Sequence, residues 1–170
     1  QPVLITTQEA LTIAHNGNKT VVFNSNIHVE FDTATGVMTT LRIKGMDIIY
    51  GNQGFEYDNF RWIENDGNTA DSNGLYATGE CKASLLNDGC VLVSTKRGGS
   101  LCATDIDYTI YPNGIVDIDA TFHPKTDNLR RVGLACAINA GLRHIDYYAH
   151  GPWENHADRL EACPVGRYST

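Results

Sequence analysis

The sequence predicts an all-β fold, an antiparallel β-sandwich. Ten or more short runs alternate apolar and polar residues, as strands with one buried face do. Gly, Asn and Asp make up about a quarter of the 170 residues and fall between these runs, where hairpin turns need them. No segment carries a long apolar repeat with the 3.6-residue period of an amphipathic helix.

The first fifty residues predict two hairpins and a further short strand. The clearest run has Ile27, Val29 and Phe31 on one face, with His28 and Glu30 on the other. The runs and turns of this part are, in order, 10–14, Asn16-Gly17, 20–23, 27–31, 32–36, 37–43, Lys44-Gly45 and 48–50. Residues 51–74 are rich in Gly and Asn, with Trp62 as the main apolar anchor, and predict a long ordered loop of the kind that often carries function.

Hairpins resume after residue 74. Asn113-Gly114 joins two runs of strict period two, 105–110 and 116–122, so each should have one buried and one solvated face. Residues 132–138 place large side chains on one face and small ones on the other, which predicts a strand covered on both sides. The remaining runs and turns are 83–86, Asp88-Gly89, 90–93, Gly98-Gly99 and a last run ending at Tyr147-Tyr148. We expect one domain spanning residues 1–170.

The composition excludes several classes of protein. The formal charge of −7 argues against binding to nucleic-acid backbones or anionic membranes, which need clustered Lys and Arg. The longest apolar run, 134–138, is far shorter than the ~20 residues of a membrane span. The chain begins at Gln1 rather than Met, so we expect a segment of a longer polypeptide, with any targeting peptide out of view.

Five cysteines, an odd number without a Cys-x-x-Cys pair, predict mainly structural or incidental roles. The sequence leaves open whether one disulfide forms, for example between Cys81 and Cys90. Only His144, His150 and His156 cluster among the six histidines, and their six-residue spacing matches no common zinc template. We therefore expect no metal site and leave the compartment open.

Two polar stretches are the candidate functional sites. An aromatic face can stack on a sugar ring, while amide, carboxylate and guanidinium groups bond its hydroxyls. The alternative is structural: arginine–carboxylate forks would fix the loops to the rim of the sandwich, and Trp153 would plug the edge of the core. The candidate residues are Arg61, Trp62, Asn65 and Asp66 in the first stretch, and Trp153, Glu154, Asn155, Asp158 and Arg159 in the second.

Four carboxylates in these stretches could form the pair of a retaining glycosidase, which needs two carboxyl groups roughly 5–5.5 Å apart. Their spacing does not show that any two meet. These residues are Glu64, Asp66, Glu154 and Asp158.

The second stretch resembles a known family. Gly151-Pro-x-Glu154-Asn155-x-x-Asp158-Arg159 resembles the Gly-Pro-x-Glu-Asn-Tyr-x-Asp-Arg signature in the C-terminal domain of β-galactosidases of glycoside hydrolase family two. His156 replaces the usual Tyr, and Ala157 the frequent Pro. Residues 60–66 resemble the family's Arg-x-Pro-x-Asp-Asn-Asp loop without its Pro, and 31–41 resemble its opening hairpin. Residues 161–167 are similar to the stretch that follows the signature, so the resemblance covers roughly 20–170.

This resemblance implies an antiparallel supersandwich similar in fold to galactose mutarotases, of which the chain would be an incomplete portion. It implies a parent that hydrolyses terminal β-galactosides with retention, with its two catalytic glutamates and its principal Mg²⁺ ligands in a separate barrel domain. We expect the fragment to have no catalytic residue and no cofactor of its own, to be inactive alone and to have the parent's other domains as partners. The galactoside substrate would reach it through the parent, whose compartment is expected to be a bacterial cytoplasm or periplasm.

Two other functions stay open. One is an independent carbohydrate-binding module with Trp62 or Trp153 as the stacking platform. The other is a mutarotase-like sugar epimerase using His150 and Glu154. A truncated sandwich should also expose strand edges, so we expect self-association by strand exchange between copies.

Overall fold

The computed structural model of the chain describes residues 9–60, 75–129, 131–153 and 160–170. The chain forms two compact units, residues 1–138 and residues 139–170. The described elements are antiparallel strands and one short 3-10 helix, which confirms the predicted all-β class.

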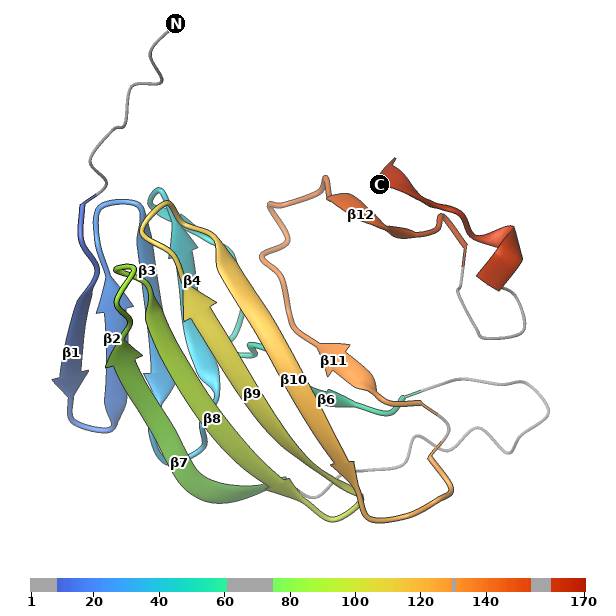
Figure 1. Cartoon of the computed structure of the whole chain (residues 1–170), viewed down its shortest axis with the longest axis horizontal. Coiled ribbons are helices and arrows are strands. Elements are labelled where there is room, and N and C mark those ends of the chain that lie inside the picture. The colour runs from blue at the N-terminus through green and yellow to red at the C-terminus, as the bar shows by residue number, and fades with distance from the viewer. Residues whose placement is uncertain (1–8, 61–74, 130, 154–159) are drawn as a thin grey trace, which may run out of the picture. The chain divides into compact units, whose positions relative to one another are not determined.

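The first unit contains two larger sheets (Figure 1). One has the order β1-β2-β3-β4-β5, and the other the order β10-β9-β8-β7. The strands of the first sheet are β1 (Thr12–Asn16), β2 (Lys19–Phe23), β3 (Ile27–Asp32), β4 (Met38–Ile43) and β5 (Met46–Asp47). Those of the second are β7 (Leu75–Leu85), β8 (Val91–Gly99), β9 (Cys102–Ile110) and β10 (Val116–Pro124).

The turn chemistry sets the hairpins as predicted. Gly89 and Gly114 have φ values of 83° and 94°, a backbone region that glycine enters without a steric penalty. In the turn between β9 and β10, the Gly114 amide donates to the Tyr111 carbonyl at 3.0 Å, and the Tyr111 amide donates to the Ile115 carbonyl at 2.9 Å. The predicted pairing of residues 105–110 with 116–122 is therefore confirmed.

The core lies between the two sheets, which makes the unit a sandwich. Alternate residues of β3, β8 and β9 are buried, as period-two strands with one covered face require. The rings of Phe31 on β3 and Tyr108 on β9 lie 5.0 Å apart and join the two layers. The fully or nearly buried core residues are Leu11, Val22, Ile27, Val29, Phe31, Met38, Leu41, Val91, Val93, Ile106, Tyr108 and Ile110.

A small strand pair replaces part of the predicted loop. Within residues 51–60, β6 (Glu56–Asp58) pairs with β11 (Gly133–Ala135). The prediction that 132–138 form a strand covered on both sides is wrong. Only three of these residues are in a strand, and Val132 and Ile138 are 43% and 42% exposed. The segment has short pairings alone, with β6 and through a single bridge between Ile138 and Ile49.

The second unit is built on one hairpin. β12 (Asp146–His150) pairs with β13 (Val165–Ser169), and the 3-10 helix Leu160–Ala162 lies between them in the sequence. The run ending at Tyr147-Tyr148 corresponds to β12, whereas sequence analysis did not identify β13. Its small, charged and aromatic residues give no apolar alternation that would reveal a strand.

All five cysteines lie in the described residues, and no disulfide joins them. Cys81 lies opposite Thr95 in the β7–β8 ladder, so the hairpin does not bring it to Cys90. Across the described residues, no helix is both long enough and apolar enough to pass through a bilayer.

Candidate functional site

Of the nine candidate residues, Trp153 lies in the described part of the chain. It is 75% exposed, so the interpretation that it plugs the edge of the core is wrong. An exposed indole leaves a face available for stacking on a ligand. The other candidates lie outside the described residues: Arg61, Trp62, Asn65, Asp66, Glu154, Asn155, Asp158 and Arg159.

The β12–β13 hairpin brackets the second motif through hydrogen bonds to backbone carbonyls. His150 Nδ1 donates to the Cys163 carbonyl at 2.6 Å, and the Gly151 amide donates to the Pro164 carbonyl at 3.3 Å. A Cβ added to Gly151 would lie 3.1 Å from the Tyr168 ring, so a larger residue there would require the ring to shift by a few tenths of an ångström. The two ends of the motif segment are thereby held together.

The first motif begins beside a second anchored segment. Arg131 Nη1 lies 3.2 Å from Asp58 Oδ2 and donates to the Phe60 carbonyl at 3.2 Å. The Phe60 amide in turn donates to Asp58 Oδ1 at 3.2 Å. One arginine therefore holds the end of the described segment at Phe60.

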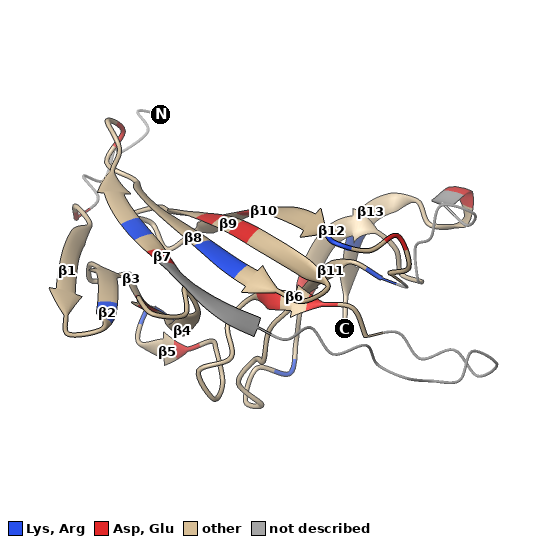
Figure 2. Ribbon diagram, turned by 90° about the horizontal axis from the view of Figure 1, so that it is seen from below, with Lys and Arg blue, Asp and Glu red and all other residues tan. Residues whose placement is uncertain are grey.

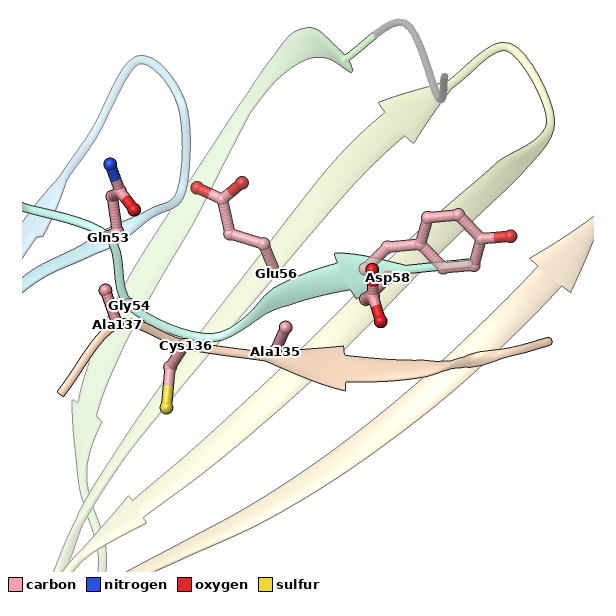
Figure 3. Close-up of a pocket in the computed structure, with 8 residues that line it drawn as sticks. Gln53, Gly54, Glu56, Asp58, Ala135, Cys136 and Ala137 are labelled. Carbon is pink, nitrogen blue, oxygen red and sulfur yellow. The ribbon is translucent and has the colours of Figure 1, made fainter. Parts of the chain in front are cut away.

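A cavity of about 300 Å³ opens beside β6 and β11 (Figure 3). Figure 3 shows the side chains of Glu56 and Cys136 extending to opposite sides of the strand pair. The residues that line the cavity are Gln53, Gly54, Glu56, Tyr57, Asp58, Ala135, Cys136 and Ala137.

The two carboxylates of this cavity are ion-paired. Glu56 Oε1 lies 3.5 Å from Nη1 of Arg97, and the Arg97 side chain is only 8% exposed. Asp58 pairs with Arg131 as described above. Each carboxylate therefore has an oxygen engaged by a guanidinium group, as in a structural ion pair.

Cys136 is the cavity residue with the softest nucleophilic atom. Burial raises the pKa of its thiol, which disfavours the reactive thiolate. Burial likewise raises the pKa of the Tyr108 hydroxyl in the core behind the Glu56–Arg97 pair, with Arg97 opposing the shift. Neither group is prepared for nucleophilic or acid–base chemistry near neutral pH.

The described residues contain no cluster of side chains typical of a metal site. Nowhere in the described residues do three or more His, Cys, Asp or Glu side chains gather as ligands. These residues do not supply a site for the Mg²⁺ that the resemblance implies for a parent enzyme.

The family follows from comparison with protein-family models. The model described as β-galactosidase small chain matches residues 23–170, which include both motif-bearing stretches and all strands from β3 onward. The chain belongs to the β-galactosidase small-chain family. A search among curated proteins gives no match.

In this small-chain domain, sequence analysis missed the arginines that hold the structure around the first motif. Arg97 lies on β8 at a position whose side chain points inward, following Val91, Val93 and Thr95 at period two. This alternation can be seen in the sequence, and it predicts that Arg97 is buried. The partner Glu56, by contrast, comes from a segment that the sequence presents as a loop, so only the fold identifies the pair.

Proposed function

We propose that this chain is a supporting, non-catalytic β-sandwich region of a β-galactosidase whose parent enzyme hydrolyses terminal β-galactosides with retention. The match of residues 23–170 to the small-chain family carries the proposal. The ion pairs of Glu56 with Arg97 and of Asp58 with Arg131 support it, since a retaining mechanism needs two carboxyl groups directed at the substrate, and these two are engaged by guanidinium groups. The reactive carboxylates and the Mg²⁺ ligands would then belong to other domains of the parent, which are the chain's partners.

The test is turnover of a chromogenic β-galactoside by the purified chain, with an intact β-galactosidase as the positive control. We expect no turnover above buffer. Turnover that follows the chain through a second purification step would contradict the proposal.

We propose a structural role for the polar residues of both motifs, namely Arg61, Asn65, Asp66, Glu154, Asn155, Asp158 and Arg159. The hydrogen bonds that hold the adjoining described segments support this role. Arg159→Ala should lower the melting temperature, whereas Trp153→Ala should leave it nearly unchanged because that side chain is exposed. An Arg159→Ala variant as stable as the parent chain would count against a structural role.

The exposure of Trp153 favours a second candidate function, weak binding of a sugar by stacking. Trp62, the other stacking candidate, lies outside the described residues. Galactose titration read by tryptophan fluorescence tests this, with Trp153→Phe as the matched variant. No spectral change at millimolar galactose, or a change that survives in Trp153→Phe, would remove Trp153 from this role.

A further inference from the structure

The outer edge of β10 is an unpaired edge of the four-stranded sheet, whose order is β10-β9-β8-β7 (Figure 1). Within the described residues of the first unit, no strand pairs with this edge. The strand runs for nine residues without a register shift against β9, so the edge is long and regular. Long regular edges are templates for pairing with another strand.

Hydrogen bonds at both ends of β10 show which backbone groups face outward. Tyr111 donates to the Ile115 carbonyl, and Lys125 donates to the Leu101 carbonyl. Hydrogen-bonded pairs recur every second residue in an antiparallel ladder, so the odd-numbered residues of β10 bond to β9. Val116, Ile118, Ala120 and Phe122 therefore direct their N–H and C=O groups to the unpaired edge.

The same even-numbered residues leave the core incompletely covered. Their side chains lie on the inner face and are only partly buried, whereas the equivalent residues of β9, Ile106, Tyr108 and Ile110, are at most 1% exposed. Phe122 contacts Tyr57 on one side, with ring centroids 6.1 Å apart. A strand added along β10 would satisfy the backbone groups and cover this apolar surface together.

The outer face of β10 carries polar side chains that a partner strand must match. Figure 2 shows acidic residues on both β9 and β10. Along β10 the outward residues are Asp117, Asp119, Thr121 and His123, so the strand is acidic at one end, with an imidazole at the other. His123 Nε2 already lies 3.2 Å from Asp105 Oδ2 of β9.

We propose that the occupant is β10 of a second copy of this chain, paired antiparallel about a two-fold axis through Ala120. In this register Asp117 lies opposite His123 of the second copy, and Asp119 lies opposite its Thr121. Ile118 lies opposite Phe122 of the second copy on the inner face, and these residues exchange both backbone hydrogen bonds. The polar and the apolar side chains are both self-complementary, as a two-fold interface requires, because an imidazole N–H can donate to the carboxylate of Asp117.

The two neighbouring registers are less favourable. An axis through Asp119 would place that carboxylate directly opposite itself, which is repulsive. An axis through Thr121 would place Val116 opposite a residue beyond the end of β10, so fewer backbone hydrogen bonds would form. Pro124, which has no N–H, lies opposite Val116 at the end of the proposed register and opposite Ile118 in this one. This inference concerns association alone and does not depend on the proposed function, so either can fail without the other.

Sedimentation of the full chain over roughly 5–500 μM, a range that brackets weak dimers, should show a monomer–dimer equilibrium. Ala120→Pro removes an amide that points away from β9, so it should abolish the dimer while circular dichroism stays native. A monomer throughout this range would overturn the proposal and leave the edge to a strand of another polypeptide.

A cysteine cross-link tests the register. Ala120→Cys places two thiols at the axis, where Cα atoms of a hydrogen-bonded pair lie about 5.5 Å apart, within disulfide range. Val116→Cys is the matched control on the same face, since its symmetry mate lies eight residues along the strand. We expect roughly tenfold more disulfide-linked dimer from Ala120→Cys than from Val116→Cys, with the unaltered chain giving the background. Equal yields, or a higher yield from Thr121→Cys, would overturn the proposed register.

Discussion

The buried ion pair behind the cavity gives a sharp test of what holds the small-chain sandwich together. Arg97 is 7% exposed, and in the described part of the chain Glu56 is the acidic group within ion-pairing distance of it. Glu56→Gln keeps the shape of the side chain and removes its charge. The guanidinium of Arg97 then stays in the interior without a counter-ion, where hydration cannot replace the lost carboxylate.

The burial of Glu56 and Arg97 sets how much unfolding free energy Glu56→Gln removes. Removing one member of a fully buried pair costs about 3–5 kcal/mol. The Glu56 side chain is 32% exposed, so water screens part of the interaction, and we expect a loss of about 2 kcal/mol in the free energy of unfolding. For a chain of this size, that loss corresponds to a fall of roughly 4–8 °C in the melting temperature.

Replacing the partner, Arg97, should destabilise the fold less than Glu56→Gln does. Arg97→Met removes the buried charge and leaves Glu56 with access to solvent, so we expect a loss below about 1 kcal/mol, and the double variant should resemble Arg97→Met. Urea and thermal unfolding followed by circular dichroism measure all three variants. The reasoning is refuted if Glu56→Gln is no more destabilising than Arg97→Met.

Three further predictions test the packing and the surface charges. Gly54→Ala should prevent stable folding, measured by circular dichroism, because its Cβ would lie 2.2 Å from the Met38 carbonyl oxygen; a native spectrum would contradict this. Phe31→Ala should lower the unfolding free energy by about 3–5 kcal/mol in urea titrations, since the ring is fully buried, and a loss under about 1 kcal/mol would be inconsistent with that burial. The hydrogen bond from Lys19 holds the pKa of Glu30 below its usual value, so Glu30 stabilises the fold above about pH 4.5 and this contribution is lost as the pH falls through its folded pKa. Glu30→Gln should flatten that part of the stability–pH curve, and an unchanged curve would remove Glu30 as a cause.

The hairpins were predictable because their signals are local. The Asn113-Gly114 pair fixes a turn whose backbone geometry glycine favours, and strict alternation on each side specifies which residues face the core. The strands β11 and β13 were harder to predict, because each is short and gains its stability from a partner distant in the sequence. In 132–138 the apolar pattern suggested full burial, yet the segment has only the short pairing with β6 and a single bridge from Ile138 to Ile49.

For the candidate site, the sequence indicated the family but not the contacts of the individual side chains. The motif around Gly151 and Asp158 was sufficient to indicate the family, since it depends on residue identity at fixed spacing rather than on folding. The exposure of Trp153, the anchoring of Phe60 by Arg131 and the pairing of Glu56 with Arg97 were not predictable in this way. Each depends on where a side chain lies relative to segments forty or more residues away, or on whether anything covers it.

The sequence by itself determined the all-β class, the tight turns and the family of this chain. These follow from the period-two alternation, from the conformational freedom of glycine at hairpin positions and from a motif read directly along the chain. Only the tertiary structure decided which carboxylates pair with arginine and which sheet edge has no partner strand among the described residues. The physical reason is that ion pairs and sheet edges arise between segments that are distant in sequence, and their energies depend on burial, which no local pattern specifies.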